Sequence, residues 1–394
     1  MRDEETVRSP RPRQPKPLRT RRAGRSSRRI PRPAPPVAAP SACRPLRPTL
    51  TLPDLPPILA IETSCDDTAA AVWAGGALAS SVVAGQRVHE GFGGVVPEHA
   101  SRAHERLIVP TIRAALDEGG VAVGDLGAVA VTVGPGLAGS LLVGLSAAKG
   151  IAVGAGVPLV GVNHLEGHVY SVFVEPPRPL LPFLCLTVSG GHTLLTLVED
   201  GFRHTELGRT RDDAAGEAFD KVAKMLGLPY PGGPHVDRLA AEGDPSFLDL
   251  PSPRLFGKYG ERPLFDLSFS GLKTAVRYWL ADLGDGRGAT LERHRADVCA
   301  AFQRTVVEAL TEAVRDAVRE TGVRAVAVVG GVSANAGLRA AVEGAGRADG
   351  FETFVPDRAH SVDNAAMIAV TAAFKLAAGE TSGLDVGAHP ALAL

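Results

Sequence analysis

The feature that most constrains the fold of this chain is a pattern that occurs twice. Residues 58–85 read as three short strands separated by small turns, and residues 183–208 repeat the same plan with different letters. Each set is followed by alternating strand and helix patterns, with buried strands expected near 128–134 and 325–331. Two copies of such a unit predict a duplicated α/β domain with a cleft between the halves.

Helical spacing of apolar residues predicts helices at 100–116, 138–152, 213–226, 235–242, 291–321, from 335 onward and at 364–376. Asp363 stands just before the last of these, where an N-cap would. The longest apolar run, 141–162, contains Lys149, five glycines and Pro158, so it predicts a helix, a turn and a strand. We therefore expect no membrane anchor.

The head of the chain differs in composition from its body. Residues 1–50 contain fourteen Lys and Arg against three acidic residues, so the rest of the chain sums to about −12 within a total of −1. Because this Arg- and Pro-rich segment has few large apolar residues, we expect disorder over 1–55. A mis-assigned start, an organellar transit peptide and a nucleic-acid-binding arm all remain open.

The cysteines and the early arginines bear on the compartment. No apolar segment follows the arginines, which argues against secretion. No CxxC pair is present, which argues against a disulfide framework or a cysteine metal knuckle. Because the cysteines are widely spaced, we expect a reducing, cytoplasmic setting. The four cysteines are Cys43, Cys65, Cys185 and Cys299.

A histidine pair in "GVNHLEGHVYS" (161–171) is the first candidate site. On a helix His164 and His168 point the same way and suit a borderline metal such as zinc, ferrous iron or nickel, although two surface histidines four apart also occur by chance. In a metalloprotease helix the Glu directly follows the first His, whereas Glu166 lies two positions on and faces away. Asp363 is a candidate third ligand, with simple N-capping as its alternative role.

Four glycine turns are the second feature: "GPGLAGS" (134–140), "VSGGHT" (188–193), "YPGGP" (230–234) and "VGGVSANAG" (329–337). Three directly follow strand patterns, where backbone amides can approach a phosphate, although any one of them is usually only a turn. None is a P-loop, because no GKS or GKT follows, and none is interpreted as a GxGxxG that opens a Rossmann unit. Asp220, beside the buried side of its helix, could bind a ribose or amino-acid hydroxyl, or simply belong to a solvated acidic face.

Taken together, the ordered motifs "IETSCDDT", "PGLAGSLLVGLSAAKGIA", "NHLEGH", "VSGGHT", "DDAAGEAFDKVAKMLGLPYPGGP", "SFSGLKTAV", "GGVSAN" and "DNAAMIA" resemble the tRNA threonylcarbamoyladenosine transferase family, once labelled glycoproteases. The resemblance implies an actin-like α/β fold of two RNase-H-like halves around a nucleotide cleft. It divides the chain into a half at 56–178, joined by a returning C-terminal helix in 362–394, and a second half at 179–361.

The resemblance also implies the reaction. A threonylcarbamoyl group would pass from threonylcarbamoyl-AMP to the exocyclic amine of the adenosine beside the anticodon, in tRNAs reading codons that begin with A, with release of AMP. One divalent metal ion is implied, Fe2+ in preference to Zn2+. The implied partners are tRNA, a paralogue lacking the metal histidines and a small ATPase, since a body of about −12 should repel tRNA unaided.

The residues that match the family's motifs are these: His164, His168 and Asp363 as metal ligands; Thr187, Val188, Ser189, Gly190 and Gly191 as the substrate loop; and Asp220, Gly233, Asp237 and Asn335 as further substrate contacts. The proton acceptor is open, with Asp66, His192 or a water as candidates. Family members often read "SCDET", where this chain has Asp67 in place of the Glu.

Four rival functions share features with this sequence. An O-carbamoyltransferase for a small molecule would share the metal triad but would carry an added carbamoyl-phosphate domain. The histidine pair argues against an actin-like kinase and against an idle scaffold paralogue, and the position of Glu166 argues against a metalloprotease.

Overall fold

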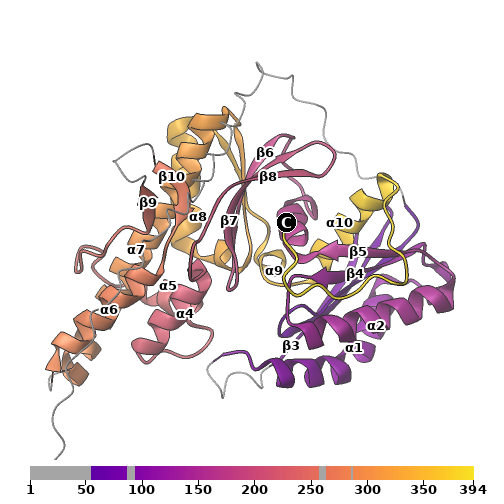
Figure 1. The fold of residues 1–394 in the computed structure, drawn as a ribbon, viewed down its shortest axis with the longest axis horizontal. Coiled ribbons are helices and arrows are strands. Elements are labelled where there is room, and N and C mark those ends of the chain that lie inside the picture. Colours follow the sequence, from indigo (N-terminus) through magenta and orange to yellow (C-terminus); the bar gives the residue numbers. More distant parts are fainter. Residues whose placement is uncertain (1–54, 87–93, 257–262, 285–286) are drawn as a thin grey trace, which may run out of the picture. The chain divides into compact units, whose positions relative to one another are not determined.

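The computed structural model describes residues 55–86, 94–256, 263–284 and 287–394 (Figure 1), all within one structural unit, 43–394. The prediction of disorder over 1–55 therefore falls outside the described residues, apart from Leu55 itself.

The first sheet has five strands in the order β3-β2-β1-β4-β5. β1, β2 and β3 form an antiparallel meander, and β4 and β5 extend it in parallel with β1. The strands are β1 (Ile58–Glu62), β2 (Asp67–Ala74), β3 (Ala77–Gly85), β4 (Ala128–Gly134) and β5 (Leu159–Asn163).

The second sheet repeats this topology strand for strand, in the order β8-β7-β6-β11-β12. Its meander is antiparallel, and β11 and β12 are parallel to β6. The strands are β6 (Phe183–Val188), β7 (Thr193–Glu199), β8 (Arg203–Arg209), β11 (Ala325–Val329) and β12 (Glu352–Phe354). The predicted duplication is confirmed: both halves are RNase-H-like α/β units.

Alternation along the strands explains how helices cover both faces of the first sheet. On β1, Leu59 and Ile61 pack in one apolar cluster with residues of α1 and α2, while Ile58 and Ala60 pack in another with α10. Figure 1 shows α1 and α2 together on one side of β4 and β5, and α10 on the other. Because α10 is enclosed by apolar neighbours, its residues from 365 to 374 are all buried.

The helices are α1 (Pro97–Gly119), α2 (Ala138–Ala155), α3 (His164–Tyr170), α4 (Ala215–Met225), α5 (Gly232–Ala240), α6 (Ser270–Asp282), α7 (Arg287–Thr321), α8 (Ala336–Asp349), α9 (Arg358–Ser361) and α10 (Ala365–Ala377), with short 3-10 turns η2 (Val123–Asp125), η3 (Ser171–Phe173) and η5 (Gly331–Ala334). The predicted helices are present. Three helices start earlier than predicted: α1 at Pro97 rather than 100, α5 at Gly232 rather than 235, and α7 at Arg287 rather than 291. At α5 the Asp220 carboxylate accepts the Gly232 amide and fixes the first turn. A hairpin of β9 (Arg254–Phe256) and β10 (Pro263–Leu267) was not predicted.

The chain after α10 covers the edge of the first sheet. Ser382 bridges β5 at Leu159, and the His389 amide donates to the Val133 carbonyl at 2.7 Å. Pro390 then accepts a hydrogen bond from the Gly136 amide at 3.1 Å. The glycine turn at 134–140, one of four considered for phosphate binding, thus receives the C-terminal segment instead.

α10 contacts all five strands of the first sheet, and it also contacts α3. This position fits a returning C-terminal helix, while the predicted boundaries at residues 55, 178 and 361 stay predictions. Among the described helices, α2 is long and apolar enough to cross a membrane by length and composition. Here α2 packs against β4 and α1, burying Leu141, Leu145 and Ala148.

Candidate metal and nucleotide site

The two histidines sit on α3, which begins where β5 ends. Asn163 caps this helix: its Oδ1 accepts the Leu165 amide at 2.8 Å, and its Nδ2 donates to the Ala393 carbonyl at 2.7 Å. With the helix start fixed, His164 and His168 project together, with ring centroids 4.7 Å apart. Both rings are buried.

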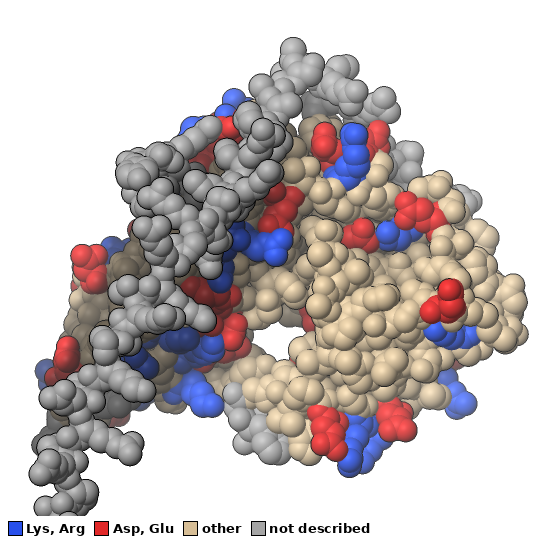
Figure 2. All heavy atoms as spheres, in the orientation of Figure 1, with Lys and Arg blue, Asp and Glu red and all other residues tan. Residues whose placement is uncertain are grey.

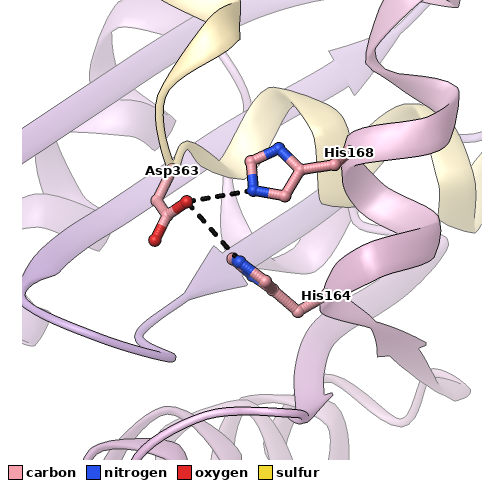
Figure 3. Close-up of side chains that lie close together, drawn as sticks. All are labelled: His164, His168 and Asp363. Atoms are coloured by element: carbon pink, nitrogen blue, oxygen red, sulfur yellow. Dashed lines mark hydrogen bonds and ion pairs between the residues drawn. The ribbon is translucent and has the colours of Figure 1, made fainter. Parts of the chain in front are cut away.

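Asp363 reaches this pair from the far end of the chain. Its Oδ1 lies 3.1 Å from the Nε2 of His168 and 3.5 Å from the Nε2 of His164 (Figure 3). Asp363 is not the N-cap of the last helix, because Asn364 takes that role by accepting the Met367 amide at 2.9 Å. The capping alternative is therefore wrong, and the Asp363 carboxylate is left to face the histidines.

A buried carboxylate behind His164 was missed by the sequence reasoning. Glu62, at the end of β1, has an oxygen 3.1 Å from the Nδ1 of His164 and accepts hydrogen bonds from the Thr132 hydroxyl and the Ser64 amide. Ser64 Oγ also lies 3.1 Å from that Nδ1. An acidic residue closing an otherwise apolar strand, "ILAIE", was the available signal.

The electrostatics of these groups are strongly coupled. Burial alone would raise the pKa of Asp363, but the histidines outweigh it and hold that pKa well below its usual value. Burial alone would lower the pKa of His164, but Asp363 and Glu62 hold it well above its usual value. Burial alone would raise the pKa of Glu62 too, but the charge of His164 outweighs it and lowers that pKa below its usual value. Every carboxylate here is stabilised by positive charge at the histidines.

The donor set fits a divalent cation. One ligand atom each from His164, His168 and Asp363 lies within 4.8 Å of the others, as ligands about 2.1 Å from a shared ion would. If His164 donates its Nδ1 proton to Glu62, its Nε2 lone pair faces an Asp363 oxygen. Two such acceptors repel unless a cation lies between them or the ring is protonated.

Glu166 points away from this cluster, as predicted. Its carboxylate pairs with Lys375 of α10 at 3.0 Å, and both side chains are largely buried. Glu166 is thus held against α10, so the general base that a metalloprotease helix requires is not supplied by this residue.

The predicted substrate loop follows β6. Thr187 and Val188 close the strand, and Ser189, Gly190 and Gly191 turn toward His192, whose carbonyl accepts the Ser189 amide at 2.8 Å. Gly330 of the glycine turn at 329–337 packs directly on this loop: it has φ 87° and ψ 166°, and an added Cβ would lie 2.6 Å from the Val188 carbonyl oxygen. Only glycine fits there.

His192 and the acidic turn after β1 lie near the metal ligands. Burial and the charges of His164 and His168 lower the pKa of His192 to about 4. Burial and the carboxylates of Asp363, Asp66 and Glu62 raise the pKa of Asp67 to about 7. In the sequence Asp67 stands out only as a departure from the family pattern. Its raised pKa could not be predicted there, because the shift depends on neighbours that folding brings close.

The remaining predicted contacts come from the second half. Asp220 of α4 accepts the Gly232 amide at 2.7 Å at the start of α5, which also carries Gly233 and Asp237. Burial raises the pKa of Asp220, and the charge of Asp66 from the first half adds to this effect. The structure thus brings Asp66 within electrostatic range of Asp220.

Asp237 and Asn335 are joined by a residue that no motif indicated. Gln303 of α7 donates to Asp237 at 3.0 Å and accepts from Asn335 at 2.7 Å. A lone Gln within a long amphipathic helix carries no sequence signal of this role.

Comparisons with known proteins place this fold and site. Full-length HypF in the phosphate- and nucleotide-bound form has a similar fold (TM-score 0.54, 13% identity, covering 83% of this chain and 47% of that one), as does HypF from T. kodakarensis (TM-score 0.52, 13% identity, 82% and 48%). At such identities the likeness concerns the fold alone. The duplicated sheets therefore define an actin-like α/β protein, here with a His-His-Asp cluster whose two histidines are buried.

Sequence comparison identifies the family. A family model described as "TsaD: tRNA N6-adenosine threonylcarbamoyltransferase" matches residues 77–370. Proteins of that name are 56% identical over 339 residues in Salinibacter ruber (86% of this chain, 99% of that protein) and 50% identical over 332 residues in Chlorobaculum tepidum (82% and 93%). The chain belongs to the tRNA N6-adenosine threonylcarbamoyltransferase family and is a transferase.

Proposed function

We propose that this chain transfers the threonylcarbamoyl group of threonylcarbamoyl-AMP to the exocyclic amine of the adenosine adjacent to the anticodon, in tRNAs reading codons that begin with A, and releases AMP. The observation that carries the proposal is the 56% identity to the Salinibacter ruber protein across 99% of that protein's length. The convergence of His164, His168 and Asp363 supports it.

The metal ligands in this proposal are His164, His168 and Asp363, holding one divalent ion. Two imidazoles and one carboxylate with open positions are typical of Fe2+, which we favour over Zn2+. A cation so held would polarise a carbonyl oxygen of the bound donor and attract its carboxylate. Glu62 would keep the Nδ1 of His164 protonated and its Nε2 available.

Donor binding falls to the loops of the second half. The amides of Gly190 and Gly191 would hold the phosphate of AMP, because this turn follows β6 beside the start of α4, while the Ser189 amide shapes the turn by donating to the His192 carbonyl. Thr187 and Val188 end β6 directly before that turn. The rest of the nucleotide would be contacted by Asp220, Gly233, Asp237 and Asn335. Catalysis would then rest mainly on orienting the donor for attack by the amine.

The proton of the attacking amine needs an acceptor. His192, with its pKa lowered to about 4, is a weak base at neutral pH. Asp66, which lies in the turn between β1 and β2 and within electrostatic range of Asp220, is the other candidate.

tRNA binding calls for partner proteins. Lys221 pairs with Glu217 and shares Asp213 with Lys273, and Arg211 pairs with Asp266, so each of these cations is balanced by a nearby carboxylate. Figure 2 shows basic and acidic side chains side by side on the face that it draws. Because phosphates need free cations, we expect a metal-site-lacking paralogue and a small ATPase to act with this chain in the cytoplasm, and low activity of the chain alone.

The test is incubation with synthetic threonylcarbamoyl-AMP, unmodified tRNA and the partner proteins, followed by nucleoside mass analysis. We expect threonylcarbamoyladenosine from the parent chain and none from His164→Ala. Glu166→Gln is a matched control on the same helix that should retain activity, because Glu166 faces α10. Equal product from His164→Ala, or no product from the parent chain, would contradict the proposal.

A further inference from the structure

The strongest feature outside the residues already assigned is a polar link centred on Gln303. Its Nε2 donates to Asp237 Oδ1 at 3.0 Å, and its Oε1 accepts from Asn335 Nδ2 at 2.7 Å. The other oxygen of Asp237 accepts the Ala336 amide at 3.0 Å, and Asn335 Oδ1 accepts the Leu338 amide at 2.9 Å as the N-cap of α8. One side chain of α7 thus ties together the starts of α5 and α8.

The chemistry of the partners fixes the direction of every bond. A carboxylate only accepts, so the NH2 group of Gln303 must face Asp237. Its oxygen must then face Asn335, whose own oxygen is held by the Leu338 amide. Flipping either amide would break at least two hydrogen bonds at once. The link therefore presents the Asp237 carboxylate and the Asn335 NH2 group in one fixed arrangement.

The fixed arrangement leaves capacity for a ligand. Each Asp237 oxygen retains a lone-pair site, and Asn335 Nδ2 has a second hydrogen beyond the one given to Gln303. Asp237 remains partly exposed while Asn335 is buried. An acceptor and a donor held in register suit a group with several hydroxyls and ring nitrogens, such as the nucleoside part of a nucleotide.

We propose that Gln303 is a positioning residue that holds Asp237 and Asn335 in the geometry needed to bind the nucleotide part of the donor. This inference rests on the proposed function, which assigns Asp237 and Asn335 to the donor. The side chain of Gln303 bonds to Asp237 and Asn335 and not to the metal ligands, so we expect it to set affinity for the donor and not the chemical step.

A second contact offers an independent way to disturb the link. Gly337, in the first turn of α8, lies against the Gln303 amide: a Cβ added there would be 2.8 Å from Nε2. Gly337→Ala must therefore push the amide away from Asp237 without removing any polar group. Thr305→Val is the matched control, because it removes a buried hydrogen bond of α7 to the Ala301 carbonyl, away from the link.

The experiment uses AMP as the probe, with calorimetric titration of the full chain. For Gln303→Met we expect about a tenfold weaker Kd for AMP, because a hydrogen bond to a charged group is lost. KM for threonylcarbamoyl-AMP should rise by a similar factor, with kcat and metal content per chain little changed. Gly337→Ala should raise the Kd and KM by a smaller factor, again with kcat and metal content little changed. Thr305→Val should lower Tm without changing the Kd.

Three outcomes decide the matter. An unchanged Kd in Gln303→Met with a lower Tm would assign Gln303 a purely structural role and overturn the proposal. Failure of the parent chain to bind AMP would overturn it too. AMP binding that weakens as expected, in a parent chain that forms no threonylcarbamoyladenosine, would support the role of Gln303 while rejecting the proposed transferase reaction. If Gln303→Met does not fold, Gly337→Ala decides alone.

Discussion

Replacing Glu62 by glutamine tests how the buried carboxylate controls His164. One Glu62 oxygen accepts the Ser64 amide, and the other faces the Thr132 hydroxyl and the Nδ1 of His164. Glutamine has a single acceptor oxygen. If its NH2 group faces His164, it donates to Nδ1 and moves the ring proton to Nε2, the atom that faces Asp363; if it faces Ser64, two donors meet.

The size of the effect follows from burial. Glu62 is 0% exposed, so water does not screen or replace the lost interaction. A hydrogen bond to a charged group is worth about 1.5–3 kcal/mol, which is about 10- to 100-fold in affinity at about 1.4 kcal/mol per factor of ten. We therefore expect Glu62→Gln to weaken binding of a divalent ion by that factor, in line with other carboxylates behind metal-bound histidines.

The assay is titration of the metal-free chain with Co2+, followed by absorbance and calorimetry, with circular dichroism as a check of folding. Thr132→Val keeps the carboxylate and should weaken binding less, whereas His168→Ala removes a proposed ligand and should weaken it more. A Glu62→Gln chain that is folded and binds Co2+ within twofold of the parent would refute the reasoning.

Three further predictions concern stability and loop geometry. Gly330→Ala should cost about 1–3 kcal/mol in unfolding free energy, because φ 87° with ψ 166° is a glycine region, and should weaken AMP binding by displacing the loop at Val188; urea denaturation and calorimetry would measure both, and an unchanged midpoint would contradict the strain argument. Since the pKa of His192 is lowered to about 4 in the fold, the unfolded chain binds more protons between about pH 6.5 and pH 4; stability should fall as the pH drops through that window, less so in His192→Asn, and parallel pH profiles would count against this. Deleting residues 389–394 removes three tertiary hydrogen bonds, including the one from Asn163. At about 1 kcal/mol each, this should lower the unfolding free energy by about 3 kcal/mol. A truncated chain as stable as the parent in the same denaturation series would show that the segment is dispensable.

The sequence by itself determined the local elements and the repeated plan. Strand alternation, helical spacing and glycine turns are properties of neighbouring residues, so they predicted both meanders, the strands β4 and β11 and most of the helices. The spacing of His164 and His168 determined that both point one way, because four residues make slightly more than one helical turn. The order of the motifs was sufficient to indicate the family.

Only the tertiary structure decided which distant groups meet. Asp363 could have been a cap, and its neighbour Asn364 proved to be the one. Glu62 and Gln303 had no local pattern, since their partners lie far along the chain: 102 residues separate Glu62 from His164, and 66 separate Asp237 from Gln303. Such pairings depend on how the two sheets and their covering helices pack, which spacing along the chain does not encode.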